Sequence, residues 1–308
     1  MTLSAFPYPG GKTVYCDEII DRMPDHRRYV EVFGGSAAVL LNKPHSYIEV
    51  YNDLDDDVVQ FFRVLRERRD ELESWLQATP FSRSLYEEWV REFYEGYRPE
   101  DDVERAGRWF YLRYTQFNGS LDRKNGFKSG GKRNEARSFR RSIDDLEMVA
   151  ARFGEVRVEC QPYHEVLDRY DHPDTLFYLD PPYYQTNSER THYRVGQDFD
   201  HARFVDELRD REGDWIVSYG DLPPGLHDLA ETVETYTAMY SMHYADQREE
   251  ATERLAMNFD PDEWPRFSAS RQATLSDRFV PATDGGRSAE GTSTSAQSSE
   301  GGDLVERE

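Results

Sequence analysis

Cysteine is scarce in this chain of 308 residues, and long apolar runs are missing. Cys16 and Cys160 form no Cys-x-x-Cys pair, so neither a disulfide framework nor a zinc site is indicated, and we expect two small, buried or half-buried thiols. Because no stretch of eighteen apolar residues occurs and no charged and apolar leader opens the chain, neither a membrane span nor a secretory signal is expected. These absences predict a soluble cytoplasmic protein with no membrane partner and no metal.

Lysine is scarce as well, because only five of the 38 cationic residues are lysines. The 60 acidic residues give the chain a net charge of -22. An acidic excess with little lysine favours solubility in concentrated salt, and we therefore expect a halophilic source. Taken alone, such a charge is also typical of a chain that avoids polyanions.

The cations that are present gather in one part of the chain. Residues 105–141 contain eleven cations and two anions, a local charge of +9, and three of the five lysines. A charge run is commonly a solvated face, but this one interrupts an otherwise acidic sequence. The window therefore predicts a surface that binds a polyanion.

The apolar pattern of the first third predicts alternating strands and helices. Residues 29–33 and 47–51 have the pattern of strands, and a glycine turn at 34–36 leads from the first of them into an apolar helix over 37–41. Three aspartates at 55–57 then precede an amphipathic helix, where a helix N-terminus favours negative charge. This order is the start of a doubly wound α/β sheet.

The remainder of the chain divides into a helical part, further strands and a tail. Residues 67–150 are charged and mostly helical in pattern, with an aromatic stripe that predicts a core and a basic, glycine-rich loop at 118–134. Beyond about residue 268 the chain is rich in Gly, Ser, Thr and Glu, which predicts disorder. The sheet is predicted to resume at 155–160, 175–179, 215–218, 236–244 and 253–259, the last two as a closing hairpin.

The tetrapeptide Asp180-Pro181-Pro182-Tyr183 follows the apolar run 175–179 directly. Two prolines end the strand and fix the backbone, so Asp180 is predicted at the carboxyl end of a sheet strand, where open α/β sheets bind ligands. A carboxylate and a free carbonyl can accept both hydrogens of an exocyclic amine, and a tyrosine ring gives its base a stacking surface. Enzymes that modify a base take it out of the duplex into a pocket of this kind.

A second constellation predicts an adenosine-type cofactor. The glycine turn after the first strand allows close approach to the backbone at a helix N-terminus, and Asp53 ends the second strand, where an acidic residue can hold ribose hydroxyls. Helix capping is the alternative role for Asp53. The segment Gly10-Gly11-Lys12-Thr13 is not a triphosphate-binding loop, because Phe6 stands where that motif needs its first glycine.

Together these segments resemble the Dam-like adenine-N6 DNA methyltransferases. The resemblance covers about residues 5–260 and rests on segments that occur in the family's order. They are Tyr8-Pro9-Gly10-Gly11-Lys12, VEVFGGSAAVLLN, Asn52-Asp53, FYLRYTQFNG and FYLDPPYY. The resemblance implies a Rossmann-like class I methyltransferase fold, with a mixed, mostly parallel seven-stranded sheet and a helical target-recognition insertion.

The resemblance also implies a division of the chain and a role for each motif. The catalytic domain would comprise residues 1–66 and 151–267, with the basic recognition insertion at 67–150 and an acidic low-complexity tail at 268–308. S-adenosylmethionine would be held by Tyr8, Lys12, Phe33, Gly35, Asp53 and Asp180. The catalytic residues would be Asp180, Pro181, Pro182 and Tyr183, and those that contact double-stranded DNA would be Arg113, Asn118, Arg123, Lys124, Lys128, Lys132 and Arg133.

Two departures from the family pattern affect precision. Ala37 stands where the glycine turn usually has its second glycine, and the segment 122–130 differs from the recognition segment of GATC-reading members. The alternatives are cytosine-N4 methylation, which Asp180 disfavours, methylation of a protein amide, which the basic window disfavours, and a catalytically silent DNA-binding protein. We expect a monomer, and a role in restriction–modification with a cognate endonuclease stays open.

Overall fold

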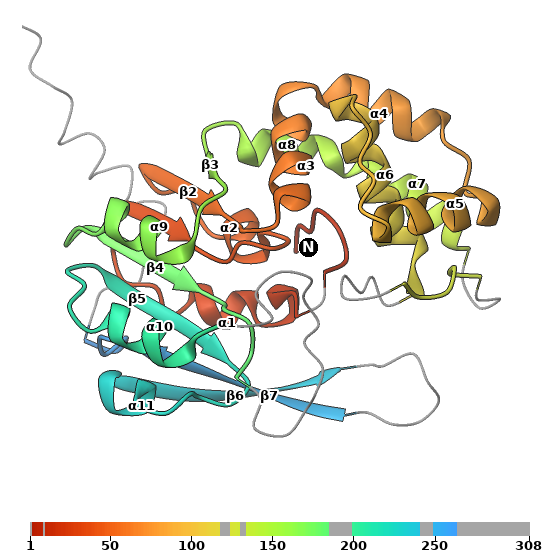
Figure 1. Cartoon of the computed structure of the whole chain (residues 1–308). Helices are drawn as coiled ribbons and strands as arrows, with labels where there is room; N and C mark the ends of the chain where they lie inside the picture. The colour runs from red at the N-terminus through yellow and green to blue at the C-terminus, as the bar shows by residue number, and fades with distance from the viewer. Residues whose placement is uncertain are drawn as a thin grey trace, which may run out of the picture.

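A seven-stranded sheet forms the centre of the computed structural model, which describes residues 2–8, 10–117, 124–129, 134–184, 199–240 and 249–263 (Figure 1). The strand order is β3-β2-β1-β4-β5-β7-β6, and β7 runs antiparallel to the others. The strands are β1 (Arg28–Glu31), β2 (Ile48–Asn52), β3 (Arg157–Glu159), β4 (Thr175–Leu179), β5 (Asp214–Tyr219), β6 (Thr232–Tyr240) and β7 (Glu249–Met257). From β1 the chain first adds β2 and β3 on one side and then β4 and the later strands on the other. The order of the strands therefore switches between β1 and β4, which is where open sheets of this class bind ligands.

Alternation along the central strand β4 divides the core into two layers. All five residues of β4 are buried, as expected of a strand covered on both faces. Leu176 and Tyr178 belong to one apolar cluster, and Phe177 and Leu179 belong to the other. Because side chains alternate along a strand, Asp180 continues the series of Leu176 and Tyr178.

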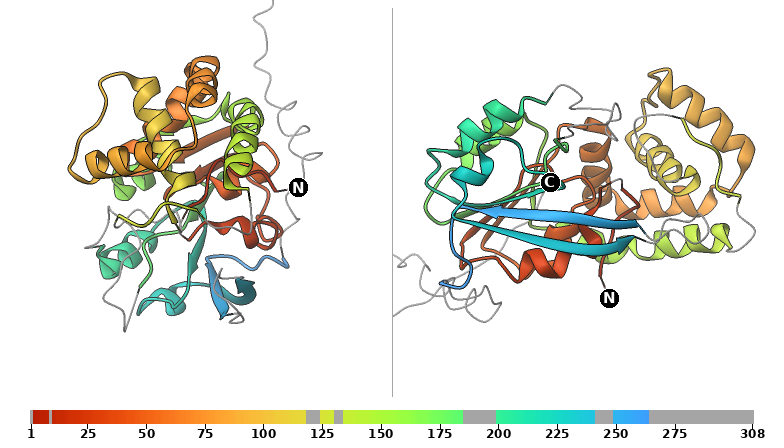
Figure 2. Two further views of the ribbon diagram at one scale, coloured as in Figure 1. Left: turned by 90° about the vertical axis from the view of Figure 1, so that its right-hand side faces the viewer. Right: turned by 90° about the horizontal axis from the view of Figure 1, so that it is seen from below.

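Helices cover both faces of the sheet (Figures 1 and 2). The cluster that contains Leu176 is completed by α1, α2, α3 and α8, and the cluster that contains Phe177 is completed by α9, α10 and α11. The bounds of these helices are α1 (Cys16–Ile20), α2 (Ala38–Asn42), α3 (Asp56–Glu67), α8 (Leu146–Phe153), α9 (Tyr163–Tyr170), α10 (His201–Leu208) and α11 (Leu226–Leu229).

The helices between α3 and α8 form a group at one end of the sheet (Figure 1). They are α4 (Arg69–Ala78), α5 (Arg83–Tyr94), α6 (Asp102–Thr115) and α7 (Glu135–Asp144). Helix α6 lies at the centre of this group and buries Trp109, Phe110 and Tyr111, so the predicted aromatic stripe is a core. Helix α6 contacts α4 and α5 within the group, and its contacts with α3 join the group to the layer of helices on the sheet.

The structure confirms the predicted fold class. The run 175–179 is β4, the other predicted strands overlap observed ones, and β6 and β7 form the predicted antiparallel hairpin, although β6 begins earlier than expected, at Thr232. Asp55 caps α3 by accepting a hydrogen bond from the Asp57 amide. Cys16 is buried and Cys160 half-buried, as predicted. Within the described ranges, no helix is long and apolar enough to cross a membrane.

Some predictions fall on residues outside the described ranges. These are the ends of the basic loop, residues 241–244 of the hairpin and the tail 268–308. The division of the chain into catalytic, recognition and tail segments stays a prediction.

Candidate active site

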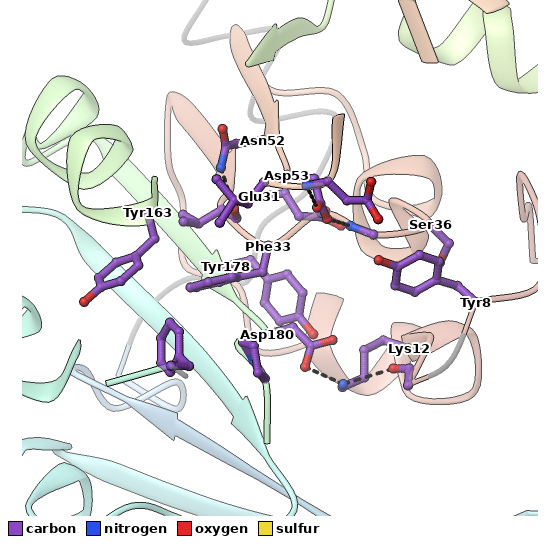
Figure 3. Close-up of a pocket in the computed structure, with 18 of the residues that line it drawn as sticks. Tyr8, Lys12, Glu31, Phe33, Ser36, Asn52, Asp53, Tyr163, Tyr178 and Asp180 are labelled. Carbon is purple, nitrogen blue, oxygen red and sulfur yellow. Dashed lines mark hydrogen bonds and ion pairs between the residues drawn. The ribbon is translucent and has the colours of Figure 1, made fainter. Parts of the chain in front are cut away.

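A cavity of about 630 Å³ lies at the carboxyl ends of β1, β2 and β4 (Figure 3). Tyr8, Lys12, Phe33, Gly35, Asp53 and Asp180 all line it. The structure thus brings together all six residues predicted to bind the cofactor, from segments up to about 170 positions apart in sequence. Among the predicted catalytic residues, Pro182 also lines the cavity, while Pro181 and Tyr183 lie just beyond it.

The glycine turn after β1 forms one wall of the cavity, and two tyrosines pack against it. A Cβ at Gly34 would lie 2.2 Å from the Tyr51 ring, and Gly35, at φ +48°, lies close to the Tyr8 ring. The Tyr51 hydroxyl donates a hydrogen bond to the Gly35 carbonyl at 2.7 Å. Both glycines are therefore required here, the first by close packing and the second also by its left-handed backbone.

Ala37, which replaces the family's second glycine, also adopts the left-handed conformation, at φ 55° and ψ 33°. It immediately precedes α2, and its amide donates to the Gly34 carbonyl at 2.7 Å. An L-residue with a side chain pays about 1–2 kcal/mol for this conformation. The departure noted in the sequence therefore leaves the turn in place and adds local strain.

Asp53 supports the same turn from the end of β2. Its Oδ2 accepts a hydrogen bond from the Gly35 amide and its Oδ1 accepts one from the Asp55 amide, both at 2.8 Å. Burial raises the pKa of Asp53 to about 6, against the opposing effect of these amides. Each carboxylate oxygen has a further lone pair, so Asp53 can also accept hydrogen bonds from hydroxyl groups in the cavity.

Aromatic rings line the side of the cavity opposite Lys12. Phe33, Tyr163 and Phe199 have ring centroids 5.4–5.8 Å apart, and all three line the cavity. Asn52 anchors the segment that leads to Tyr163, because its side chain exchanges hydrogen bonds with the backbone of Gln161. Such a wall suits a planar, weakly polar ring.

Asp180 lies on the Lys12 side of the cavity, away from these aromatic rings, and is paired with Lys12 (Figure 3). The Lys12 Nζ lies 2.6 Å from Asp180 Oδ1 and 2.9 Å from the Tyr183 hydroxyl. Only 3% of the Lys12 side chain is exposed, against 14% for Asp180. The resemblance implied a contact between Lys12 and the cofactor, and the structure adds that its ammonium binds the tetrapeptide itself.

A second carboxylate, Glu253 of β7, joins this group. Its oxygens accept hydrogen bonds from the Tyr183 hydroxyl, at 2.8 and 3.0 Å, and from the Ser218 hydroxyl, at 2.7 Å. The Lys12 Nζ lies 3.5 Å from Glu253. The tetrapeptide, the N-terminal lysine and two sheet strands thus form one buried polar network.

The charges of this network shift the pKa values of its members. Burial raises the pKa of Asp180 to about 6; Lys12 opposes this rise and Glu253 adds to it. Burial would lower the pKa of Lys12, but Asp180, Tyr183 and Glu253 outweigh it and hold that pKa above its usual range. Lys12 is therefore a permanent cation, while Asp180 titrates closer to neutrality than an ordinary aspartate.

Several cations of the basic window are used within the protein. Arg105 pairs with Asp56 and Asp57, and Arg108 pairs with Glu92 and Glu104. Arg140 donates to the backbone carbonyls of residues 76, 77 and 79. These three arginines hold the helices together, so the +9 window overstates the charge available to a partner.

Arg113, predicted to contact DNA, does not fit that role. Its side chain is fully buried, with the guanidinium 5.3 Å from the centroid of the Trp109 ring and 5.9 Å from that of Phe93. A group with no exposed surface cannot reach a phosphate of DNA on the protein surface, because other side chains cover it. The prediction failed because Arg113 lies on the core face of α6, one turn after Trp109 and next to Leu112, both of which are buried.

The described part of the basic loop, residues 124–129, lies beside the end of α6. Phe127 forms an antiparallel bridge with Gln116, and its ring packs on those of Phe81 and Tyr86. This anchor leaves Lys124 exposed and Lys128 half-buried, and burial lowers the pKa of Lys128. Outside the described residues lie the predicted contacts Asn118, Arg123, Lys132 and Arg133.

Sequence reasoning missed four members of the site. Glu253 and Ser218 lie in predicted strands but carried no motif, and Tyr163 and Phe199 are separated from the glycine turn by more than a hundred residues. No local signal singled out Glu253, because β7 contains three glutamates and an arginine, and only the fold shows that Glu253 is the buried one that needs a partner.

Comparisons with known proteins agree with this arrangement. Residues 8–250 match the family model described as D12 class N6 adenine-specific DNA methyltransferase. The chain is 26% identical over 201 residues to the Type II methyltransferase M.MjaIII of Methanocaldococcus jannaschii, covering 58% of this chain and 68% of that one.

Two further relatives are a phage and a bacterial protein. The DNA N-6-adenine-methyltransferase of Escherichia phage P1 is 26% identical over 241 residues, which cover 73% of this chain and 31% of the relative. The DNA adenine methylase of Vibrio cholerae is 26% identical over 183 residues, which cover 57% of this chain and 63% of the relative. The chain thus spans less than two thirds of these two relatives. Since the family model matches well over half of its length, the chain belongs to the D12 class of N6 adenine-specific DNA methyltransferases.

Proposed function

We propose that this chain transfers a methyl group from S-adenosylmethionine to the N6 amino group of an adenine that is flipped out of double-stranded DNA. The single observation that carries the proposal is the shared cavity. It joins the glycine turn and Asp53 at one end to the Asp180 carboxylate at the other. A nucleoside-type donor and an exocyclic amine could therefore meet inside it.

The residues of the cavity suit this donor. Phe33, Tyr163 and Phe199 would take its adenine ring, and Asp53 would accept its ribose hydroxyls. A volume of about 630 Å³ lies in the range of cavities that enclose molecules of this size. When bound, the donor supplies an electrophilic methyl group on a sulfonium, and the protein contributes alignment and charge.

Asp180 and the Pro181 carbonyl would orient the target amine. The two hydrogens of the amine need two acceptors, and Asp180 has its Oδ2 in addition to the Oδ1 that binds Lys12. Hydrogen bonds to both hydrogens favour a more tetrahedral nitrogen with an available lone pair. The nitrogen would gain positive charge as its bond to the methyl carbon forms and the carbon–sulfur bond breaks to leave a neutral thioether, and it would then release one amine proton to solvent. An ionised Asp180 beside the nitrogen would lower the energy of that transition state.

DNA would lie across the mouth of the cavity and the exposed end of the helical group. Within the described residues, the exposed Lys124 is a candidate for a phosphate contact. Arg137 and Arg141 of α7, which follows the basic loop, are also exposed. Tyr183, beside Asp180, would stack on the flipped base. The finer assignments to Arg123, Lys128, Lys132 and Arg133 are part of the same proposal.

Methylation-sensitive long-read sequencing of DNA from cells that express this chain tests the proposal. We expect N6-methyladenine at one short recognition sequence, and none in cells that express the Asp180→Ala variant. N4-methylcytosine would instead support the cytosine alternative. Unmodified DNA together with no binding of labelled S-adenosylmethionine by the purified chain would support a silent DNA-binding protein.

A further inference from the structure

Glu253 occupies a position from which it can control the orientation of Tyr183. It lies on β7 and is buried, on the same face of that strand as Leu255 and Met257. Ser218 of β5 pairs in register with Leu255 and points to the same face. The glutamate is thus held by the sheet itself and reaches out from it to the Tyr183 hydroxyl.

The Tyr183 hydroxyl has two charged partners in fixed positions. It donates to Glu253 at 2.8 Å and accepts from the Lys12 ammonium at 2.9 Å. A phenol that donates in one direction and accepts from another has a defined ring orientation. Tyr183 itself follows two prolines, which restrict the backbone that carries its ring, and the two hydroxyl contacts fix the other end of the side chain.

We infer that Glu253 is a positioning residue of the methyl-transfer site, which holds the Tyr183 ring in the orientation that receives the flipped base. The inference rests on the function proposed above. Ser218 serves the glutamate in turn, since its hydroxyl donates to Oε1 at 2.7 Å and satisfies an oxygen that faces the core. The neighbouring strands β5 and β7 therefore contribute to base capture, although neither strand carries one of the recognised motifs.

A purely structural role for Glu253 has a different signature. A carboxylate that only balances the charge of Lys12 would act through the 3.5 Å contact between these two groups, and any nearby carboxylate could serve. A positioning carboxylate has to reach the Tyr183 hydroxyl. Shortening the side chain by one methylene while keeping its charge distinguishes the two roles.

The experiment measures steady-state transfer of labelled methyl groups into unmethylated DNA of mixed sequence, for Glu253→Gln, Glu253→Asp, Tyr183→Phe and the double variant Glu253→Gln with Tyr183→Phe. Glu234→Gln is the matched control, because it removes a carboxylate from the adjacent strand β6 that pairs with Arg22 instead. We expect kcat/KM for DNA to fall by about tenfold or more in both Glu253 variants, as for loss of a hydrogen bond to a charged group. The Kd for S-adenosylmethionine should stay within about twofold of wild type, and the control should keep wild-type kinetics.

The double variant decides the matter. If Glu253 acts through the Tyr183 hydroxyl, adding Glu253→Gln to Tyr183→Phe should change kcat/KM by less than about twofold, because the partner is already gone. Independent, multiplicative losses would overturn the inference, and so would a Glu253→Asp variant with wild-type kinetics.

Failure of the proposed function would be recognised separately. If the wild-type chain transferred no methyl group to DNA, the same variants would be compared by urea unfolding. Strongly non-additive shifts of the unfolding midpoint would support the hold of Glu253 on Tyr183, and additive shifts would overturn it.

Discussion

The charged residues around the cavity and those of the helical group beside it are arranged in opposite ways. Around the cavity, Lys12, Asp180 and Glu253 come from three distant segments and converge on one point. In the helical group, arginines that are close in sequence turn toward acidic residues of neighbouring helices, as Arg108 does toward Glu92. Clustering in sequence therefore did not show which of these cations are available to a partner, whereas the charged cluster at the cavity exists only in the fold.

The largest expected effect comes from breaking the convergent cluster. Asp180→Asn keeps the size of the side chain and removes the charge that would face the developing positive charge on the amine. We expect kcat to fall by about 100-fold or more while the Kd for S-adenosylmethionine changes little. Single-turnover methyl transfer measures the first, and equilibrium binding of labelled donor the second. An Asn variant with wild-type turnover would remove Asp180 from the chemistry.

The second prediction tests which cations of the basic window are available. Charge reversal of Lys124 and Lys128 to Glu should raise the Kd for DNA by about tenfold and flatten its dependence on salt, because two phosphate contacts are lost. Arg105→Gln is the matched comparison, since Arg105 is paired with Asp56 and Asp57. It should lower the unfolding temperature and leave the salt slope unchanged. If Arg105→Gln altered the salt dependence of the Kd and the lysine reversal did not, the assignment of Lys124 and Lys128 as the available cations would be wrong.

The third prediction concerns pH. Asp180 has to be ionised to accept hydrogen bonds from the amine, and burial raises its pKa to about 6. The proton therefore binds as the pH falls through about 6, and kcat/KM should drop about tenfold for each further pH unit. An ordinary aspartate would keep its activity to about pH 4. A profile of kcat/KM against pH, corrected for unfolding by a parallel measurement of structure, checks this; a flat profile down to pH 5 would contradict it.

The smallest expected effect lies in the glycine turn. Ala37→Gly relieves a left-handed backbone but adds freedom to the unfolded chain, so the free energy of unfolding should rise by less than about 1 kcal/mol. Urea unfolding measures the change, with Ala38→Gly in α2 as the control that should destabilise. Destabilisation by Ala37→Gly would show that its methyl group contributes more packing than its backbone conformation costs.

The fold was predictable where local pattern and sheet position coincide. The buried run 175–179 ends at two prolines, so both its bounds and the place of Asp180 followed from sequence. The glycine turn and Asp53 were likewise tied to the ends of β1 and β2. The positions of these residues could be predicted because strand ends, prolines and glycine turns are determined by only a few neighbouring residues.

The rest of the site depends on contacts that no local pattern contains. Lys12 and Asp180 are 168 positions apart, and Glu253 meets Tyr183 only because β7 inserts between β5 and β6. Arg113 was misassigned for the same reason, since its charge was visible in the sequence and its burial on the core face of α6 was not. Long-range packing decided each of these cases.

The most direct test of the central claim is the chemical identity of the product. Purified wild-type chain and the Asp180→Asn variant would be incubated with methyl-labelled S-adenosylmethionine and unmethylated duplex DNA, and the digested nucleosides separated by chromatography. We predict that the label appears in N6-methyl-2′-deoxyadenosine with the wild-type chain and is nearly absent with the variant. Label in N4-methyl-2′-deoxycytidine, or equal label in N6-methyl-2′-deoxyadenosine from both proteins, would contradict the account.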